Sequence, residues 1–177
     1  MIKCCSPAKA PKIEVEFNNN NDDNSDYFTT STLNNVVRSH VGNLFIMHEN
    51  IRSFCEIFDE FHSFASELNR IADVIMLSET WFSANTCHDV QGYTGFHTYR
   101  ADKTGGGVSV FIRNCYTSTR MADFSVCHAY YEISVVKVSL SNNCTVIIIG
   151  VYRPPDKLKI PEFTIKLNEN FAINCTI

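Results

Sequence analysis

The chain has 177 residues, a net charge of −4 and a hydrophobic fraction of 45%. This length accommodates one sizeable domain with its own core and excludes two large ones. The composition is that of a folded globular protein, not a disordered chain. The acidic balance argues against a broad basic surface for nucleic acid, although it leaves room for a local basic cleft.

The eight cysteines include no pair with the two-residue gap typical of zinc sites and redox motifs. We therefore expect free thiols and a reducing compartment. Residues 1–10 lack the apolar segment of a secretory signal, and no apolar run reaches membrane-spanning length. These features predict a nuclear or cytoplasmic protein that is not secreted and has no membrane partner.

The N-terminal segment 1–25 is polar and irregular, and it predicts a disordered polar tail followed by one domain, or the N-terminal portion of one, over residues 26–177. A short helix is expected to begin at Ser31 or Thr32 and to end at Gly42. The residues expected on its apolar face are Leu33, Val36 and Val37.

The segment 43–50 is expected to form a first buried strand, and Ser53 can cap the helix that follows it. A second buried strand over 74–77 runs directly into Glu79. This strand, helix, strand order is typical of a βαβ-like unit, which would bring Asn50 and Glu79 to the same edge of one sheet. The apolar residues that recur at helical spacing are Phe54, Ile57, Phe58, Phe61, Phe64, Ala65 and Leu68.

Glu79 is a candidate functional residue because a rigid strand fixes the carboxylate while the tip of the strand meets solvent. The alternative is a solvated residue that marks the end of the strand.

The three glycines of segment 105–107 precede a strand rather than a helix, and no P-loop lysine follows them. A hairpin turn or a close approach of two backbones is therefore favoured over a phosphate loop. Further strands are predicted over 95–99, 108–113, 130–140 and 144–152, and a final helix over 161–171. Consecutive strands joined by turns indicate an antiparallel or mixed sheet.

Four segments then occur in a specific order and spacing. They are His48–Ser53, Ser78–Trp81, Tyr99–Asp102 with Gly105–Val108, and Tyr152–Pro155. Together they resemble the endonuclease/exonuclease/phosphatase superfamily, and more narrowly the apurinic-endonuclease-like domain of non-LTR retrotransposons. The resemblance implies an α/β (α+β) fold, a partial four-layer α/β/β/α sandwich that lacks its C-terminal part.

The resemblance also implies a divalent-metal-dependent endonuclease that nicks DNA, with a downstream reverse transcriptase domain in intact relatives. Glu79 matches the glutamate that binds Mg²⁺ (or Mn²⁺), and Asn50 matches the asparagine that helps to hold the scissile phosphate. Tyr152 matches the tyrosine whose hydroxyl reaches that phosphate. A hard cation prefers such oxygen ligands and neutralises charge in the transition state.

Two departures from the family pattern limit this expectation. Arg52 occupies a position that is often acidic in repair enzymes, and it either contacts a phosphate or pairs with a carboxylate. No Asp-x-Asn or Ser-Asp-His segment follows Pro155, and all six histidines precede Tyr152. We therefore expect a truncated domain that is inactive, or nearly so, on its own.

The second hypothesis is a non-catalytic remnant that binds nucleic acid or protein through Arg100, Lys103 and Arg113. A phosphatase or lipid phosphodiesterase of the same superfamily is the third and is less favoured by the motifs. The candidate substrate-binding residues are Arg52, Arg100, Lys103 and Arg153.

Overall fold

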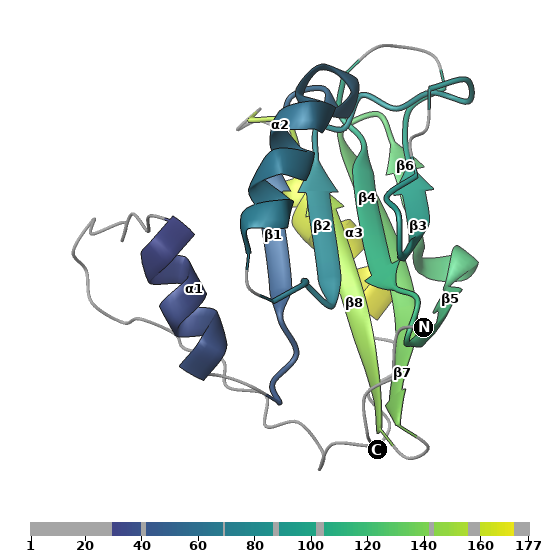
Figure 1. The fold of residues 1–177 in the computed structure, drawn as a ribbon. Helices are drawn as coiled ribbons and strands as arrows, with labels where there is room; N and C mark the ends of the chain where they lie inside the picture. Colours follow the sequence, from purple (N-terminus) through teal and green to yellow (C-terminus); the bar gives the residue numbers. More distant parts are fainter. Residues whose placement is uncertain are drawn as a thin grey trace, which may run out of the picture.

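A computed structural model describes residues 30–39, 42–68, 70–86, 89–101, 105–141, 144–155 and 160–171 (Figure 1). The predicted tail over 1–25 lies outside these residues. In chain order the elements are α1 (Thr30–Ser39), β1 (Ile46–Asn50), α2 (Phe54–Glu67), β2 (Val74–Ser78), β3 (Tyr93–Thr98), β4 (Val108–Arg113), β5 (Thr117–Arg120), the 3₁₀ turn η1 (Ala122–Phe124), β6 (Val126–His128), β7 (Tyr131–Ser141), β8 (Cys144–Tyr152) and α3 (Ile160–Phe171).

The strands form two sheets. The first has the order β1-β2-β4-β3, in which β1 and β2 are parallel and the other neighbours are antiparallel. In the second, β7 pairs with β5 and β6 on one side and with β8 on the other. The prediction of an antiparallel or mixed sheet after one βαβ-like unit is therefore confirmed, and the described residues contain both helices and sheets, consistent with an α+β fold.

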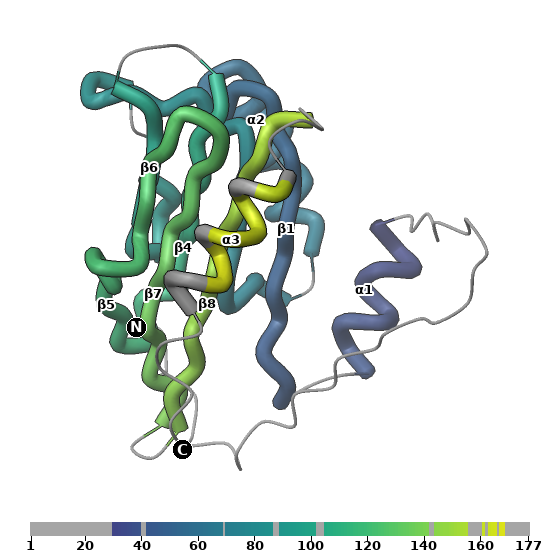
Figure 2. The backbone as a smooth tube through the Cα atoms, turned by 180° about the vertical axis from the view of Figure 1, so that it is seen from behind, coloured from purple at the N-terminus to yellow at the C-terminus, as the bar shows by residue number. Residues whose placement is uncertain are grey.

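The core is divided between the two faces of each sheet. Ile75 and Leu77 on β2 pack with α2, whereas Val74 on the opposite face packs with Val136 and Ile148 of the second sheet. Helix α3 packs on the far face of the second sheet, where Figure 2 shows it crossing β7 and β8. Along this direction the layers are helix, sheet, sheet and helix. None of the described helices is both long and apolar enough to span a bilayer.

Helix α2 carries the predicted apolar stripe. Phe54, at its first position, is 0% exposed, and Phe61 is also buried. The predicted cap is wrong, because the Ser53 side chain makes no capping hydrogen bond at its φ of 81°. The Phe54 amide instead donates to the Thr80 carbonyl over 3.1 Å, so the loop after β2 satisfies this end of the helix.

Strand β1 is not the buried strand that its apolar residues predicted. It lies at the edge of the first sheet, and Ile46 remains 41% exposed. Val36 of α1 is likewise 43% exposed, whereas Val37 is buried. An apolar run indicates a strand, but the order of strands in the sheet determines whether both faces of that strand are covered.

The prediction of a hairpin turn or a close backbone approach at segment 105–107, in place of a phosphate loop, agrees with the structure, since the segment lies between the antiparallel neighbours β3 and β4. All three glycines have positive φ values, of 99°, 74° and 93°. Strands β5 and β6 were not predicted. They have four and three residues, and the Thr-Ser-Thr-Arg sequence of β5 has no apolar alternation to reveal it.

A buried carboxylate, Asp73, anchors the end of the first sheet where β2 begins. Its Oδ2 accepts hydrogen bonds from the Arg70 guanidinium at 2.8 Å and the Phe45 amide at 2.9 Å. Its Oδ1 accepts the Tyr116 hydroxyl at 3.0 Å and lies 3.6 Å from Arg113. The negative charge and hydrogen bond of Asp73, together with burial as the largest cause, raise the pKa of Tyr116.

The substitution Asp73→Asn is expected to lower the free energy of unfolding by about 2–3 kcal/mol, because it removes the charge that several hydrogen bonds share. Urea unfolding of the two proteins measures the change. The matched control Asp59→Asn, at an exposed position of α2, should stay within about 0.5 kcal/mol of the parent. Equal stability of the Asp73 and Asp59 variants would contradict the anchoring role.

Candidate functional site

Asn50 and Glu79 meet where the parallel strands β1 and β2 have their C-terminal ends, at one edge of the first sheet. The parallel register aligns Asn50 with Ser78, and the Ile51 amide donates to the Ser78 carbonyl over 3.0 Å. The Asn50 Nδ2 then donates to Glu79 Oε1 over 2.9 Å. The prediction that a βαβ unit would place these two residues at the same edge is confirmed.

Strained backbone is concentrated in the two loops at this edge. In the described part of the chain, the non-glycine residues with positive φ are Arg52, Ser53, Glu79 and Trp81. Each such conformation costs about 1–2 kcal/mol for an L-residue. Strain of this kind persists where surrounding structure enforces it, and it gathers at functional sites.

The left-handed φ of 55° at Glu79 changes the direction of its side chain. Continued strand alternation would place Glu79 beside Leu77, on the face covered by α2. The carboxylate instead meets Asn50 and a residue of the facing sheet. The Ser53 amide holds this conformation by donating to the Glu79 carbonyl over 2.8 Å.

Tyr152, at the end of β8, is the residue that reaches Glu79 from the second sheet. Its pKa is raised first by burial, then by the negative charge of Glu79 and a hydrogen bond to it. Glu132 raises this pKa further, whereas Arg100 lowers it. The phenol is therefore protonated at neutral pH and can donate its hydrogen.

A buried ion pair, between Arg100 and Glu132, lies close enough to Tyr152 for both charges to affect its pKa. The side chains of Arg100 and Glu132 are 9% and 0% exposed, and Arg100 Nε contacts Glu132 Oε1. Glu132 lies directly opposite Tyr152 in the β7–β8 register. Sequence reasoning missed Glu132, although the strand alternation of β7 places this acidic residue on the inward face, where a charge needs a partner.

Among the other predicted substrate-binding cations, Arg52 is two residues after Asn50 and Arg153 directly follows Tyr152. Arg52 is exposed in the loop after β1, and Arg153 donates to the neighbouring Pro154 carbonyl over 2.9 Å. Lys103 lies outside the described residues. Arg113 stands beside Asp73 at the far end of β4 from Arg100, so these two do not form one basic patch.

The donor set around Glu79 is compatible with a weakly held hard cation. In the described ranges, no group of three or more His, Cys, Asp or Glu side chains could hold a metal. However, Mg²⁺ is often bound through one or two carboxylates together with water and substrate phosphate oxygens. Glu79 supplies one such carboxylate, while the charge of Glu132 is balanced by Arg100.

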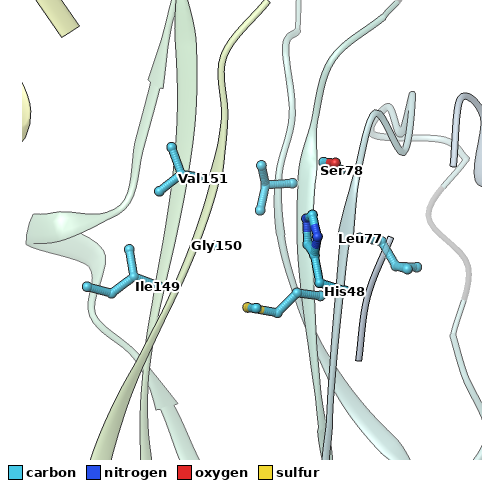
Figure 3. Close-up of a pocket in the computed structure, with 8 residues that line it drawn as sticks. His48, Leu77, Ser78, Ile149, Gly150 and Val151 are labelled. Atoms are coloured by element: carbon cyan, nitrogen blue, oxygen red, sulfur yellow. The ribbon is translucent and has the colours of Figure 1, made fainter. Parts of the chain in front are cut away.

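A cavity of about 290 Å³ adjoins this site between the two sheets. Figure 3 shows His48, Leu77 and Ser78 on one side of it, with Ile149, Gly150 and Val151 on the other. His48, which lines this cavity, is otherwise exposed on the edge strand β1. The lining is mainly apolar, and the polar side chains of Asn50, Glu79 and Tyr152 lie at the adjacent strand ends.

A second polar pair, His97 with Ser109, is a packing feature. The His97 Nδ1 lies 2.9 Å from Ser109 Oγ, but Ser109 is 0% exposed and cannot reach a substrate. The imidazole packs edge-on against Phe82 and Phe111. Burial is the largest cause that lowers the pKa of His97, and Arg120 adds to it, whereas Asp89 opposes it.

This lowered pKa predicts a loss of stability in mild acid. Below the ordinary histidine pKa of about 6.5 the unfolded chain binds a proton that the native His97 resists. The free energy of unfolding therefore decreases as the pH is lowered. Urea unfolding between pH 7.5 and 5 measures the slope. The variant His97→Gln should show a smaller slope than the parent, and an unchanged slope would contradict this assignment.

Neither a scan against protein-family models nor a search of curated proteins finds a match to this chain.

Proposed function

We propose that this chain carries part of a divalent-metal-dependent DNA endonuclease site of the endonuclease/exonuclease/phosphatase type, as in non-LTR retrotransposons. The observation that carries the proposal is the meeting of Asn50, Glu79 and Tyr152, which arrive from three strands and two sheets. The succession of helix, sheet, sheet and helix supports a partial four-layer sandwich.

In this proposal Glu79 holds Mg²⁺ or Mn²⁺, and Asn50 keeps the carboxylate in place through its amide. The bound metal would neutralise charge on the phosphate as a phosphodiester bond breaks. The protonated Tyr152 hydroxyl would donate to a phosphate oxygen. None of these three residues is a base that activates water, so slow cleavage by the isolated chain is expected.

Terbium luminescence tests the metal site, because Tb³⁺ is a hard cation that binds carboxylates and is sensitised by nearby tryptophan. Trp81, the only tryptophan of the chain, is two residues from Glu79. Glu79→Gln should weaken Tb³⁺ binding by on the order of 100-fold, at least as much as the loss of a supporting residue would. The control Glu60→Gln, on the exposed side of α2, should bind like the parent.

Nicking of supercoiled plasmid with Mg²⁺ tests the reaction in the same three proteins. A low activity that EDTA and Glu79→Gln both abolish, and that Glu60→Gln retains, supports the endonuclease. Equal background nicking together with equal Tb³⁺ binding would overturn it. If that outcome were found and the Glu79→Gln variant still bound DNA, the non-catalytic binding module would be favoured.

A further inference from the structure

The Arg100–Glu132 pair joins the two sheets beneath the site. Arg100 follows β3 in the first sheet, and Glu132 belongs to β7 in the second. Both side chains are at least nine-tenths buried. Burying such a pair is costly, and apolar residues of similar volume often give equal or greater stability. The pair therefore calls for an explanation other than stability.

The backbone of Gly106 lies against this pair. A Cβ atom at Gly106 would lie 3.0 Å from Glu132 Oε1 and 3.1 Å from Arg100 Cζ. The pair and the glycine thus fit each other closely, since a methyl group here would require the ion pair to move by a few tenths of an ångström. The φ of 74° at Gly106 is also one that glycine adopts at little cost.

Gly106 in turn holds the loop that carries Glu79. Its carbonyl accepts the Trp81 amide hydrogen over 3.0 Å, and Trp81 has a left-handed φ of 56°. On the other side of the pair, Glu132 lies opposite Tyr152, the residue that contacts Glu79. The ion pair therefore touches both of the segments that bring Glu79 and Tyr152 together.

We propose that the Arg100–Glu132 ion pair is the positioning element of the site, which fixes Glu79 through Gly106 and Trp81 and fixes Tyr152 across the β7–β8 ladder. The proposal rests on the proposed function of Glu79. It assigns Arg100 a role inside the protein, in place of direct contact with substrate.

The test replaces both charges with apolar residues of similar length, Arg100→Met together with Glu132→Leu. This double variant avoids the unpaired buried charge that either single change would leave, so the fold should persist. Thermal unfolding followed by circular dichroism verifies this. Arg113→Met, which removes a cation at the other end of β4, is the matched control.

In the double variant the Trp81 emission is expected to shift to longer wavelength and to become more accessible to acrylamide, as the turn loosens. Tb³⁺ affinity should fall about tenfold or more, the usual effect of losing a residue that orients a metal ligand. Arg113→Met should leave both readouts unchanged. Parent-like Trp81 emission and Tb³⁺ affinity in a folded double variant would overturn the positioning role.

Arg100→Lys provides a second variant, because it keeps the charge but loses the planar guanidinium against Gly106. It should change Trp81 emission in the same direction, and parent-like emission here would also count against the proposal. The two proposals fail separately. If the parent shows no Glu79-dependent Tb³⁺ binding, the metal site is wrong, whereas the Trp81 emission still decides the positioning role.

Discussion

Replacing Phe54 with alanine is expected to lower the free energy of unfolding by about 3–5 kcal/mol, a cost typical of emptying a buried phenylalanine site. Phe54 is 0% exposed, and its ring contacts at least four others within the described residues. Two of these, Phe58 and Phe61, are on α2, while Phe82 and Phe111 belong to the loop after β2 and to β4. The substitution therefore removes a ring that packs against α2, the loop after β2 and β4 together.

Urea unfolding measures this prediction, and the midpoint should fall without a large change in slope. Phe64→Ala, at a half-buried position of the same helix, is the matched control and should cost markedly less. If the two variants had equal stability, the Phe54 site would not be the point at which α2 is attached to the sheet.

Gly107→Ala is expected to cost about 2–5 kcal/mol, from two separate causes. The φ of 93° at Gly107 is unfavourable for any residue with a Cβ atom. The added methyl would also lie 2.6 Å from Oγ1 of Thr80, a residue that is fully buried. Since Thr80 follows Glu79, the displaced segment should also weaken the contact between Glu79 and Asn50.

Two further variants separate these causes. Gly105→Ala has a similar φ of 99° but no atom of the described residues within 4 Å of the added methyl, so it should show the backbone cost alone. Thr80→Ala removes the clashing oxygen and should recover part of the loss when combined with Gly107→Ala. Identical unfolding free energies for Gly105→Ala and Gly107→Ala would contradict the steric argument.

The regular elements could be predicted where periodicity is strong. The apolar run of β2, the spacing of α2 and the β-branched stretch of β8 each gave the right element, because burial pattern and local propensity agree there. The edge position of β1 could not be predicted, since it depends on which strand lies beside it in the sheet. Strands β5 and β6 were too short and too polar to be recognised.

The candidate site was predictable only in part. Strand ends and motif order indicated Asn50, Glu79 and Tyr152, and the structure brings these three together. The left-handed turn at Glu79 was not predictable, because glutamate has no preference for that conformation. Glu132 was missed because its partner, Arg100, is 32 residues away in the chain and meets it only when the sheets pack.

The division of the chain between the sheets has a consequence for the order of folding. Every strand of the first sheet lies within residues 46–113, and every strand of the second within 117–152. Each sheet can therefore complete its ladder from its own contiguous segment, with comparatively short loop closures. The contacts of Glu79 with Tyr152 and of Arg100 with Glu132 form only when the two halves dock. In a refolding experiment, protection of the backbone amides of both sheets from hydrogen exchange should therefore develop before the contacts between Glu79 and Tyr152 form.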